Sequence, residues 1–497
     1  MPPTIVSLHR WTDPHDVSPV LAHCLADLGG IAALVQPGQM VVIKPNLTAN
    51  APEESGGATR VALVEALVRQ VQRCAPGRVV VAEGTGMFGL SHETAFPRPA
   101  WREMAARTGV ELYNLDAGPH TPVRLADGRY PDDLPVADIL LEADVLITVP
   151  CLKTHITTDY TVALKNAYAH IPQMSRTEVH RQYMVEHALV DINRIRLPDL
   201  IIVDAYDGAE GIAGGIKFDR PAGARLLLAG VDPVAVDTVA RELMGMTYRT
   251  RYLAWAAEAG LGTADRDEIE VRGEPVQALA RRFQTAAEEM CQVLPGLQVI
   301  DHNACSGCRV AALSAVQRYL DQGIARPFAL VMGGGENIPA LGCPAIVVGN
   351  CAARHAHLGV HIAGCPASSD AVRQEMEAQE LVCLKCRGLS EGLLGQLPAA
   401  LAPYLRLVAA GAQVHVGEQV YGGPWHVELL VGRCSAAYAG RVVERASQMG
   451  LDPERDIILL RGCPPAPQKV LAAFSQLEAA VAAHLAQPDM EPTRALP

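Results

Sequence analysis

Short runs of apolar, mostly β-branched residues alternate with helix-like patterns from about residue 4 to residue 245. This alternation is typical of an α/β domain built on a largely parallel sheet. The expected strands are apolar on both faces, as a sheet flanked by helices requires. They span Met40 to Ile43, Arg78 to Ala82, Val145 to Val149, Leu200 to Val203, and Arg225 to Leu228.

One helix has clear signals at both ends. An apolar series with helical spacing runs from Val61 to Cys74, with Thr59 as the expected N-cap and Gly77 as the expected stop. Cys74 continues the apolar face of this helix, so we expect it to be a core residue rather than a ligand.

Polar residues with useful chemistry directly follow the expected strands. In a parallel sheet these positions meet at the carboxyl edge, where α/β folds bind their ligands. They are Lys44 and Asn46 after the first strand, Glu83 after the second, Lys153 and His155 after the third, and Asp204 and Asp207 after the fourth. We therefore expect these residues to converge on one cleft.

Lys153 and His155 carry the strongest signal, because ionisable side chains directly after a buried strand are costly without a polar partner. The predicted catalytic residues are Lys153, His155, Lys44 and Asp207, and the predicted substrate-binding residues are Asn46, Glu83, Lys165, Asn166 and Asp204. The alternatives are helix caps or loop residues for the two acids after the second and fourth strands, and an ordinary surface turn for Lys165 and Asn166. His180 and His187 are expected to be solvated on a surface helix.

Composition narrows the function classes. A chain of 497 residues predicts two or three domains, and a formal charge of −12 with mixed signs argues against a nucleic-acid partner. The N-terminus lacks the pattern of a signal peptide, and the longest weakly charged stretch, 328–353, is broken by glycines and prolines and does not form a membrane span. We expect a soluble cytoplasmic protein, whose thirteen cysteines are ligands and core residues rather than disulfides.

Eight of these cysteines form two copies of one pattern. Each copy has a Cys-x-x-Cys pair, a Gly-x-Cys after a strand-like run, and a Gly-Cys-Pro before a helix-like run. The first copy contains Cys305, Cys308, Cys351 and Cys365, and the second contains Cys383, Cys386, Cys434 and Cys463. An internal repeat of roughly ninety residues predicts two repeated small α/β cysteine modules after the parallel-sheet domain.

Four thiolates hold either zinc or an iron–sulfur cluster. Structural zinc sites usually join two close pairs, whereas each copy here joins one pair to two isolated cysteines. Glycines beside the ligands and a closing Cys-Pro are typical of ferredoxin-like cluster loops. The spacing favours two [4Fe–4S] clusters, with zinc as the alternative and exchange of ligands between the copies left open. His355, His357 and His361 have no counterpart in the second copy, so we do not expect them to be ligands.

Four motifs in succession resemble the DUF362 family. They are Val42 to Leu47, Pro150 to His155, Val162 to Asn166, and Gly230 to Asp237, and the resemblance covers about residues 40 to 245. It implies an iron–sulfur protein, and members often carry a ferredoxin-like cluster segment, in place of which this chain has the duplicated module. The lysines, histidine and asparagine of these motifs are implied as site residues, without fixed catalytic roles.

The expected domains are an α/β domain at 1–290, cysteine modules at 296–382 and 383–475, and a tail at 476–497. Two clusters beside a polar cleft predict an iron–sulfur oxidoreductase that exchanges electrons with a small anionic substrate, with a redox partner such as a ferredoxin. Two alternatives stay open: an electron-transfer or cluster-carrier protein without substrate chemistry of its own, and a non-redox enzyme whose clusters are structural or act as a Lewis acid.

Overall fold

The computed structural model describes most of the chain up to residue 382 and parts of the remainder. The described residues are 3–47, 51–85, 95–182, 184–214, 220–247, 250–319, 324–336, 338–379, 381–382, 405–409, 412–415, 427–431 and 457–460, with isolated positions between 473 and 482. The chain forms two compact units, Met1–Glu289 with Asn303–Val310, and Met290–His302 with Ala311–Pro497. The predicted ligands Cys383, Cys386, Cys434 and Cys463 lie outside the described residues.

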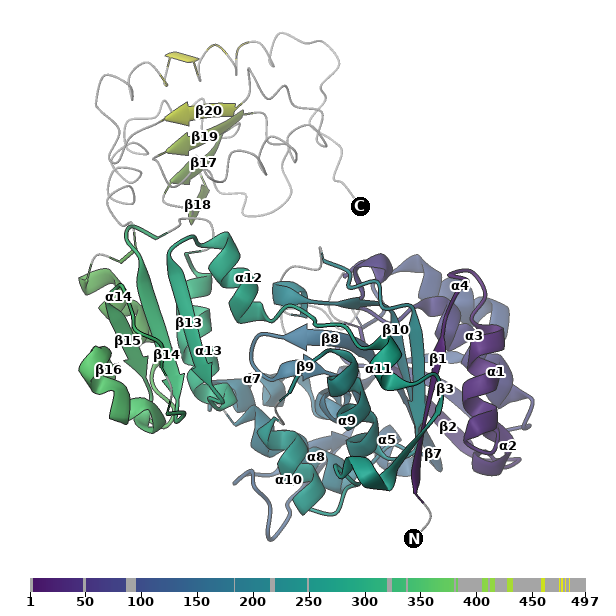
Figure 1. The fold of residues 1–497 in the computed structure, drawn as a ribbon. Coiled ribbons are helices and arrows are strands. Elements are labelled where there is room, and N and C mark those ends of the chain that lie inside the picture. The colour runs from purple at the N-terminus through teal and green to yellow at the C-terminus, as the bar shows by residue number, and fades with distance from the viewer. Residues whose placement is uncertain are drawn as a thin grey trace. The chain divides into compact units, whose positions relative to one another are not determined.

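The first unit is built on a ten-stranded sheet in the order β12-β1-β11-β10-β7-β2-β3-β4, with β8 paired to β10 and β9 to β8 (Figure 1). The strands are β1 Thr4–Arg10, β2 Met40–Pro45, β3 Arg78–Glu83, β4 Glu111–Asn114, β7 Val145–Val149, β8 Cys151–His155, β9 Asp159–Thr161, β10 Leu200–Ala209, β11 Leu226–Gly230 and β12 Ile269–Gly273. Neighbours from β10 through β7, β2 and β3 to β4 are parallel, whereas β11 is antiparallel to β1 and β10. A separate antiparallel pair joins β5 His120–Val123 and β6 Leu134–Ala137.

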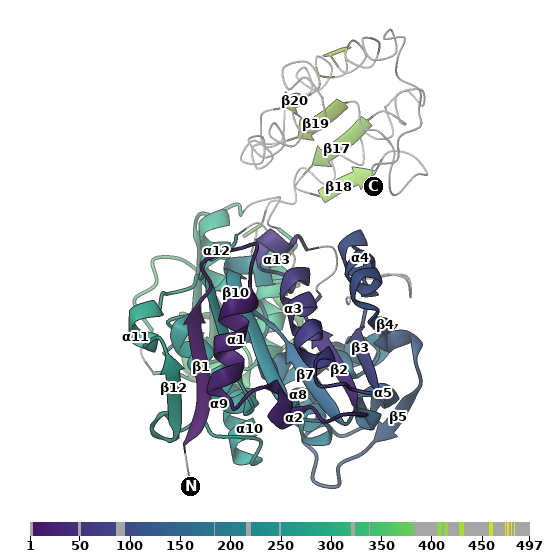
Figure 2. The same ribbon diagram turned by 90° about the vertical axis from the view of Figure 1, so that its right-hand side faces the viewer.

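Helices cover both faces of this sheet. The helices of the first unit are α1 Ser18–Asp27, α2 Ile31–Leu34, α3 Val61–Gln72, α4 Pro99–Thr108, α5 Asp138–Glu142, α6 Ala163–Asn166, α7 Gln173–Arg181, α8 Val185–Ile195, α9 Pro233–Leu243, α10 Arg251–Glu258 and α11 Val276–Leu279, with short 3-10 turns η1 Glu53–Ser55, η3 Leu115–Ala117, η4 Ala167–His170, η5 Gly211–Gly214 and η6 Arg266–Glu268. Helix α12 Ala286–Val293 begins in the first unit and ends in the second. One apolar core joins α1, α3 and α4 to one face, and a second joins α6, α8, α9 and α10 to the other (Figures 1 and 2). The predicted α/β class, mainly parallel and flanked by helices, is confirmed.

The five expected strands are all present, but one helix begins differently from the prediction. Thr59 does not cap α3, because its hydroxyl bonds to the Val149 carbonyl at 2.7 Å and receives the Asn46 N–H at 2.8 Å. The N-cap is Arg60, whose N–H donates instead to the carboxylate of Asp204, 2.8 Å away. The start of α3 is therefore tied to the middle of β10 by a distant acid rather than by a local hydroxyl.

The second unit contains two four-stranded sheets. The first, in the order β13-β14-β15-β16, is parallel throughout, and the second, β18-β17-β19-β20, is parallel from β17 through β19 to β20. Their strands are β13 Leu297–His302, β14 Phe328–Gly333, β15 Ala345–Val348, β16 Gly359–Ile362, β17 Leu405–Ala409, β18 Ala412–His415, β19 Val427–Val431 and β20 Ile457–Leu460. The described helices here are α13 Ser306–Gln317, which begins in the first unit, η7 Asn350–Leu358 and α14 Ser369–Ala378.

The two sheets share one relation to the cysteine pattern. In each, two successive parallel strands end three residues before a cysteine of the repeat, so that Val348, Ile362, Val431 and Leu460 precede Cys351, Cys365, Cys434 and Cys463. Of these four strands, β15 and β19 lie where the repeat predicts a strand before the third cysteine of each copy. The cysteine site of the second copy stays a prediction.

Candidate functional site

A buried ion pair joins the ends of β2 and β3. Lys44 Nζ lies 2.9 Å from Glu83 Oε1 and 3.0 Å from Oε2, and 3.4 Å from Asn166 Oδ1 on α6. Lys44 is 0% exposed and Glu83 is 2% exposed. Burial lowers the pKa of Lys44, and the Glu83 carboxylate opposes this shift. Three predicted site residues are therefore in direct contact, although Lys44 is enclosed rather than open to solvent.

Lys153 lies close to this pair. It is 2% exposed, and its Nζ donates to the Gly57 carbonyl at 2.8 Å. Burial lowers its pKa, while the neighbouring Cys151 and Glu83 raise it. Cys151 itself is a packed thiol, 3.7 Å from the Thr59 hydroxyl, and burial raises its pKa to about 12.

Of Lys44, Lys153 and Lys165, Lys165 has the fewest neighbours that offset its positive charge. Within the described part of the chain, its ammonium group has neither a hydrogen bond nor an ion pair, and the side chain is partly exposed. Desolvation in its dense surroundings lowers its pKa to about 7, and Lys153 lowers it further. Lys165 in turn lowers the pKa values of His155 and His180, where burial is the main cause in both. Lys153, Lys165, His155 and His180 thus lie in one region where positive charge is disfavoured. A bound anion would stabilise their charged forms.

His155 is held in one orientation. Its Nδ1 lies 3.1 Å from the Thr157 N–H nitrogen and 2.9 Å from the Thr157 hydroxyl. His180 was expected to be solvated, but it bonds to the Tyr168 hydroxyl at 2.7 Å and to the Arg176 carbonyl at 2.9 Å. That expectation was wrong, because α7 packs its His180 face inward, and burial lowers the pKa of His180 to about 4.

The two acids expected after the fourth strand, Asp204 and Asp207, lie within β10 instead, because this strand continues to Ala209, and they form a separate group at the start of α3. Asp204 is 5% exposed and accepts N–H groups from Arg60 and Tyr206, yet burial raises its pKa to about 6. Asp207 forms an ion pair with Arg60, whose guanidinium lies 4.6 Å from the Tyr206 ring centre. Asn46 is placed by its N–H bond to Thr59, and its Oδ1 is buried without a hydrogen-bond partner among the described residues.

The buried pair Asp116 and Arg176 was not predicted from the sequence. Their side chains are 5% and 4% exposed and lie 2.9 Å apart. Asp116 also accepts the N–H of Thr85, and Arg176 donates to the Thr85 carbonyl at 2.7 Å. A Cβ on Gly84 would lie 2.6 Å from Arg176 Nη1, so a larger residue here would displace the guanidinium from its place beside Asp116. The pair thereby fixes the turn that follows Glu83.

Lysine scarcity is a sequence signal that marks this site. Lysine and arginine total 42, but only six are lysines, and three of the six are Lys44, Lys153 and Lys165. Arginine serves as well as lysine for a surface charge, whereas only lysine supplies a compact amine that can lose its proton near neutral pH. Half of the lysines of the chain thus lie around Glu83 and His155.

The first predicted cysteine pair also belongs to the first unit. Hydrogen bonding from the Cys308 side chain, followed by the backbone N–H groups of Cys308 and Gly307, lowers the pKa of Cys305 to about 5. Ser306, between them, donates its N–H at 3.1 Å and its hydroxyl at 3.0 Å to Glu186, which is 3% exposed. A lowered pKa at Cys305, directly before α13, suits a thiolate metal ligand, so this pair is chemically compatible with the predicted group.

The other two cysteines of the first copy lie on neighbouring loops of the second unit. The Asn350 N–H donates to the Gly364 carbonyl at 2.9 Å, and the Gly364 N–H donates to Asn350 Oδ1 at 2.8 Å, which holds the Cys351 and Cys365 loops together. Both cysteines are exposed. In the residues that the structure describes, no three His, Cys, Asp or Glu side chains are grouped closely enough to hold a metal ion. The assignment of the eight cysteines as metal ligands stays a prediction.

The three histidines of the same copy have structural partners. His355 Nε2 lies 2.7 Å from the Gly335 carbonyl, His357 Nδ1 lies 3.2 Å from the Arg354 carbonyl, and His361 Nε2 lies 3.1 Å from the Gly349 carbonyl. Each contact ties a ring nitrogen to a backbone oxygen, and His361 thereby supports the loop that leads to Cys351.

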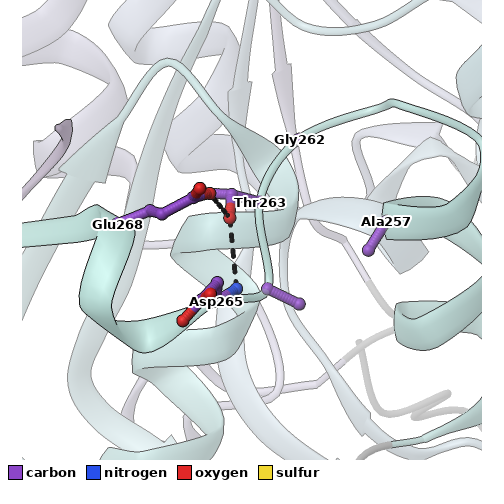
Figure 3. Close-up of a pocket in the computed structure, with 6 residues that line it drawn as sticks. Ala257, Gly262, Thr263, Asp265 and Glu268 are labelled. Carbon is purple, nitrogen blue, oxygen red and sulfur yellow. Dashed lines mark hydrogen bonds between the residues drawn. The ribbon is translucent and has the colours of Figure 1, made fainter. Parts of the chain in front are cut away.

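An open cavity of about 490 Å³ lies elsewhere in the first unit (Figure 3). It is lined by Ala257, Gly262, Thr263, Ala264, Asp265 and Glu268. The Thr263 N–H donates to Asp232, which directly follows β11, and the end of β11 pairs with the beginning of β10. The cavity therefore sits at the edge of the sheet opposite to Lys44 and Glu83. Its Thr263 and Glu268 side chains bond to each other at 2.7 Å, which makes them part of the loop structure.

Comparison with known proteins gives a family match but no established reaction. Residues 41–242 match the family model "Domain of unknown function (DUF362)". A thylakoid-associated protein of Synechocystis sp. is 29% identical over 232 residues, which cover 44% of this chain and 67% of that protein. The lactate racemase apoprotein of Thermoanaerobacterium thermosaccharolyticum has a TM-score of 0.25 at 14% identity over 41% of this chain and about half (51%) of its own length, a likeness too low to support an argument. Among the described helices, none has the length and apolar character needed to cross a bilayer.

Proposed function

We propose that this protein is an iron–sulfur oxidoreductase that exchanges electrons with a small anionic substrate held beside Lys165, Lys153 and His155. The observation that carries the proposal is that the Cys305-x-x-Cys308 turn belongs to the unit that contains these amines. Buried Glu186 binds Ser306 of this turn. A protein that only carried electrons would not need this contact between the cysteine turn and the α/β unit.

The cofactors we propose are two [4Fe–4S] clusters, held by Cys305, Cys308, Cys351 and Cys365 and by the four cysteines of the second copy. Such clusters supply single-electron exchange. The low pKa of Cys305 supports the proposal, because a thiolate that is stable at neutral pH is the form that binds iron. Zinc is the alternative that metal analysis excludes or supports directly.

The amines define the substrate class. Lys165 has no partner among the described residues, and a carboxylate or enolate placed beside it would compensate the positive charge that burial and Lys153 disfavour there. The Nδ1 of His155 accepts hydrogen bonds, so its Nε2 carries the proton and serves as a donor to a bound anion. We propose that Lys165 and His155 bind the anionic group. Lys153 adjusts the pKa values of both residues through its positive charge.

The proposed setting follows from the same chemistry. The nine described cysteines are all free, which suits a reducing compartment, and we propose a cytoplasmic location with a redox protein such as a ferredoxin as electron partner. The net charge of −12 supports a partner other than nucleic acid.

Anaerobic purification with metal and sulfide analysis tests the cofactor. Two [4Fe–4S] clusters give about eight irons and about eight acid-labile sulfides per chain, with absorption that bleaches on reduction. Stoichiometric zinc without sulfide would overturn the proposal. A redox titration then separates electron-carrying clusters from structural ones.

The enzyme and the carrier are separated at Lys153. Because this side chain is buried, Lys153→Met is a better test than Lys153→Ala, which would also leave a cavity. We expect Lys153→Met to keep its iron and its fold but to lose the spectral response of the reduced clusters to small carboxylates. An unchanged response in the variant, or no response in the wild type to any carboxylate tested, would favour an electron carrier.

A further inference from the structure

The turn that carries His155 is held from outside by Arg309, one residue after Cys308. Arg309 Nη1 lies 3.0 Å from Asp159 Oδ2 and 3.3 Å from the Thr157 carbonyl oxygen. The Arg309 and Asp159 side chains are 6% and 10% exposed, so this is a largely desolvated ion pair. Asp159 has a φ of +64°, a left-handed conformation that is uncommon for a residue other than glycine. The pair therefore holds a turn in which the backbone of Asp159 has a conformation of higher energy.

Inside the turn, backbone and side-chain donors converge on one nitrogen of His155. The Thr157 N–H and hydroxyl lie 3.1 and 2.9 Å from Nδ1, and the Thr158 N–H lies 3.4 Å from it. A nitrogen that faces two backbone N–H donors must be an acceptor, which places the proton of the neutral imidazole on Nε2. Any change in the turn between Thr157 and Asp159 changes these bonds first.

We propose that Arg309 is a positioning residue that holds His155 as its Nε2–H tautomer and thereby ties the site to the Cys305–Cys308 turn. This rests on the assignment of His155 to the site in the proposed function. Arg309 reaches Thr157 and Asp159 from the same helix turn whose Ser306 is bound by buried Glu186. Two anchors, one anionic and one cationic, join this turn to the α/β unit. A shift of the Cys305–Cys308 turn is transmitted to His155 through the guanidinium.

The test uses the full chain with ¹⁵N-labelled histidine and follows the ring nitrogens of His155 by NMR across neutral pH. The His155 signals are identified by their loss in His155→Asn. Arg309→Met removes the guanidinium, and Arg309→Met combined with Asp159→Asn removes it without leaving a buried unpaired charge. Arg309→Lys keeps the charge but loses the planar fork. Arg354→Met is the matched control, because Arg354 is an exposed arginine of the second unit that pairs with Glu336.

Wild type and Arg354→Met should show a single Nε2–H tautomer. Arg309→Met and the double variant should show averaged signals from both tautomers and a His155 that becomes protonated at higher pH than in the wild type. Arg309→Lys should restore the single tautomer only in part. If the folded double variant shows the same His155 signals as the wild type, the positioning role is overturned. If neither Arg309→Met nor the double variant folds, wild-type signals in Arg309→Lys overturn it instead. This readout needs neither substrate nor turnover, so a protein with full iron and unchanged His155 signals rejects the positioning role and leaves the proposed function standing.

Discussion

Lys44 Nζ contacts both carboxylate oxygens of Glu83, at 2.9 and 3.0 Å, with neither residue more than 2% exposed. The register places Lys44 at the end of β2, beside β3, so two neighbouring parallel strands each supply one charge. Glu83 also accepts the N–H groups of Gly84 and Leu47. The pair is a buried electrostatic unit in which each partner neutralises the other.

Removing both partners should cost less stability than the two single removals added together. Lys44→Met or Glu83→Gln alone should lower the free energy of unfolding by about 3–5 kcal/mol, because each leaves an uncompensated buried group, whereas the double variant should lose less than the sum. Urea unfolding measures all three. The exposed pair Arg78 and Glu111 is the control, and Glu111→Gln should change stability by no more than about 1 kcal/mol. Additive effects at Lys44 and Glu83 would contradict the coupling.

Asp204 should give stability a specific pH dependence. Its folded-state pKa is raised from 3.8 to about 6 by burial, so between these values the folded protein binds more protons than the unfolded chain. Stability from this group therefore falls as pH rises from 4 to 6, by up to about 2–3 kcal/mol. Asp204→Asn lacks this titration. In urea unfolding, the wild type should therefore lose stability relative to Asp204→Asn as the pH rises from 4 to 6. A stability difference that stays constant between these values would show that Asp204 does not titrate there.

The sequence predicted the fold more fully than the site. Apolar runs fixed the positions of β2, β3 and β7, because a strand buried on both faces must be apolar throughout. The strand ends that meet at one edge of a parallel sheet placed Lys44 and Glu83 in one region, but their direct contact was not predicted. The antiparallel insertion of β11 was not predictable, since parallel and antiparallel central strands have similar composition.

Contacts between distant segments account for what the sequence could not predict. Asp116 and Arg176 look like ordinary surface charges in the sequence, and only the fold brings them together around Thr85. His180 has the spacing of a solvated helix residue, but Tyr168 covers it. Arg309 follows the Cys305–Cys308 pair and has no distinguishing pattern in the sequence. Only the fold brings it into contact with Asp159.

Lys165 should make anion binding depend on pH. With a pKa of about 7, the amine is mostly charged at pH 6 and mostly neutral at pH 8. The affinity for a small carboxylate, measured by calorimetry, should therefore fall about tenfold from pH 6 to pH 8 if the charged form binds. Lys165→Met should bind weakly at both values. Lys165→Arg should bind with little change between them, because arginine stays charged. A wild-type affinity that does not change with pH would remove Lys165 from the binding site.

The cysteines offer a matched comparison between a predicted ligand and a packed thiol. Cys305 has a pKa lowered to about 5 by its bonds with the Cys308 turn, whereas Cys151 is 1% exposed with a pKa raised to about 12. Cys305→Ala should lower the iron content by about half, to about four irons per chain, and Cys351→Ala should do the same, because each removes a ligand of the first cluster only. Cys151→Ala should keep all its iron, since its thiol is held as a core group. Iron analysis of anaerobically purified variants, with circular dichroism to confirm folding, checks this. Full iron in folded Cys305→Ala would exclude it as a required ligand, and loss of nearly all iron would show that the two copies share ligands.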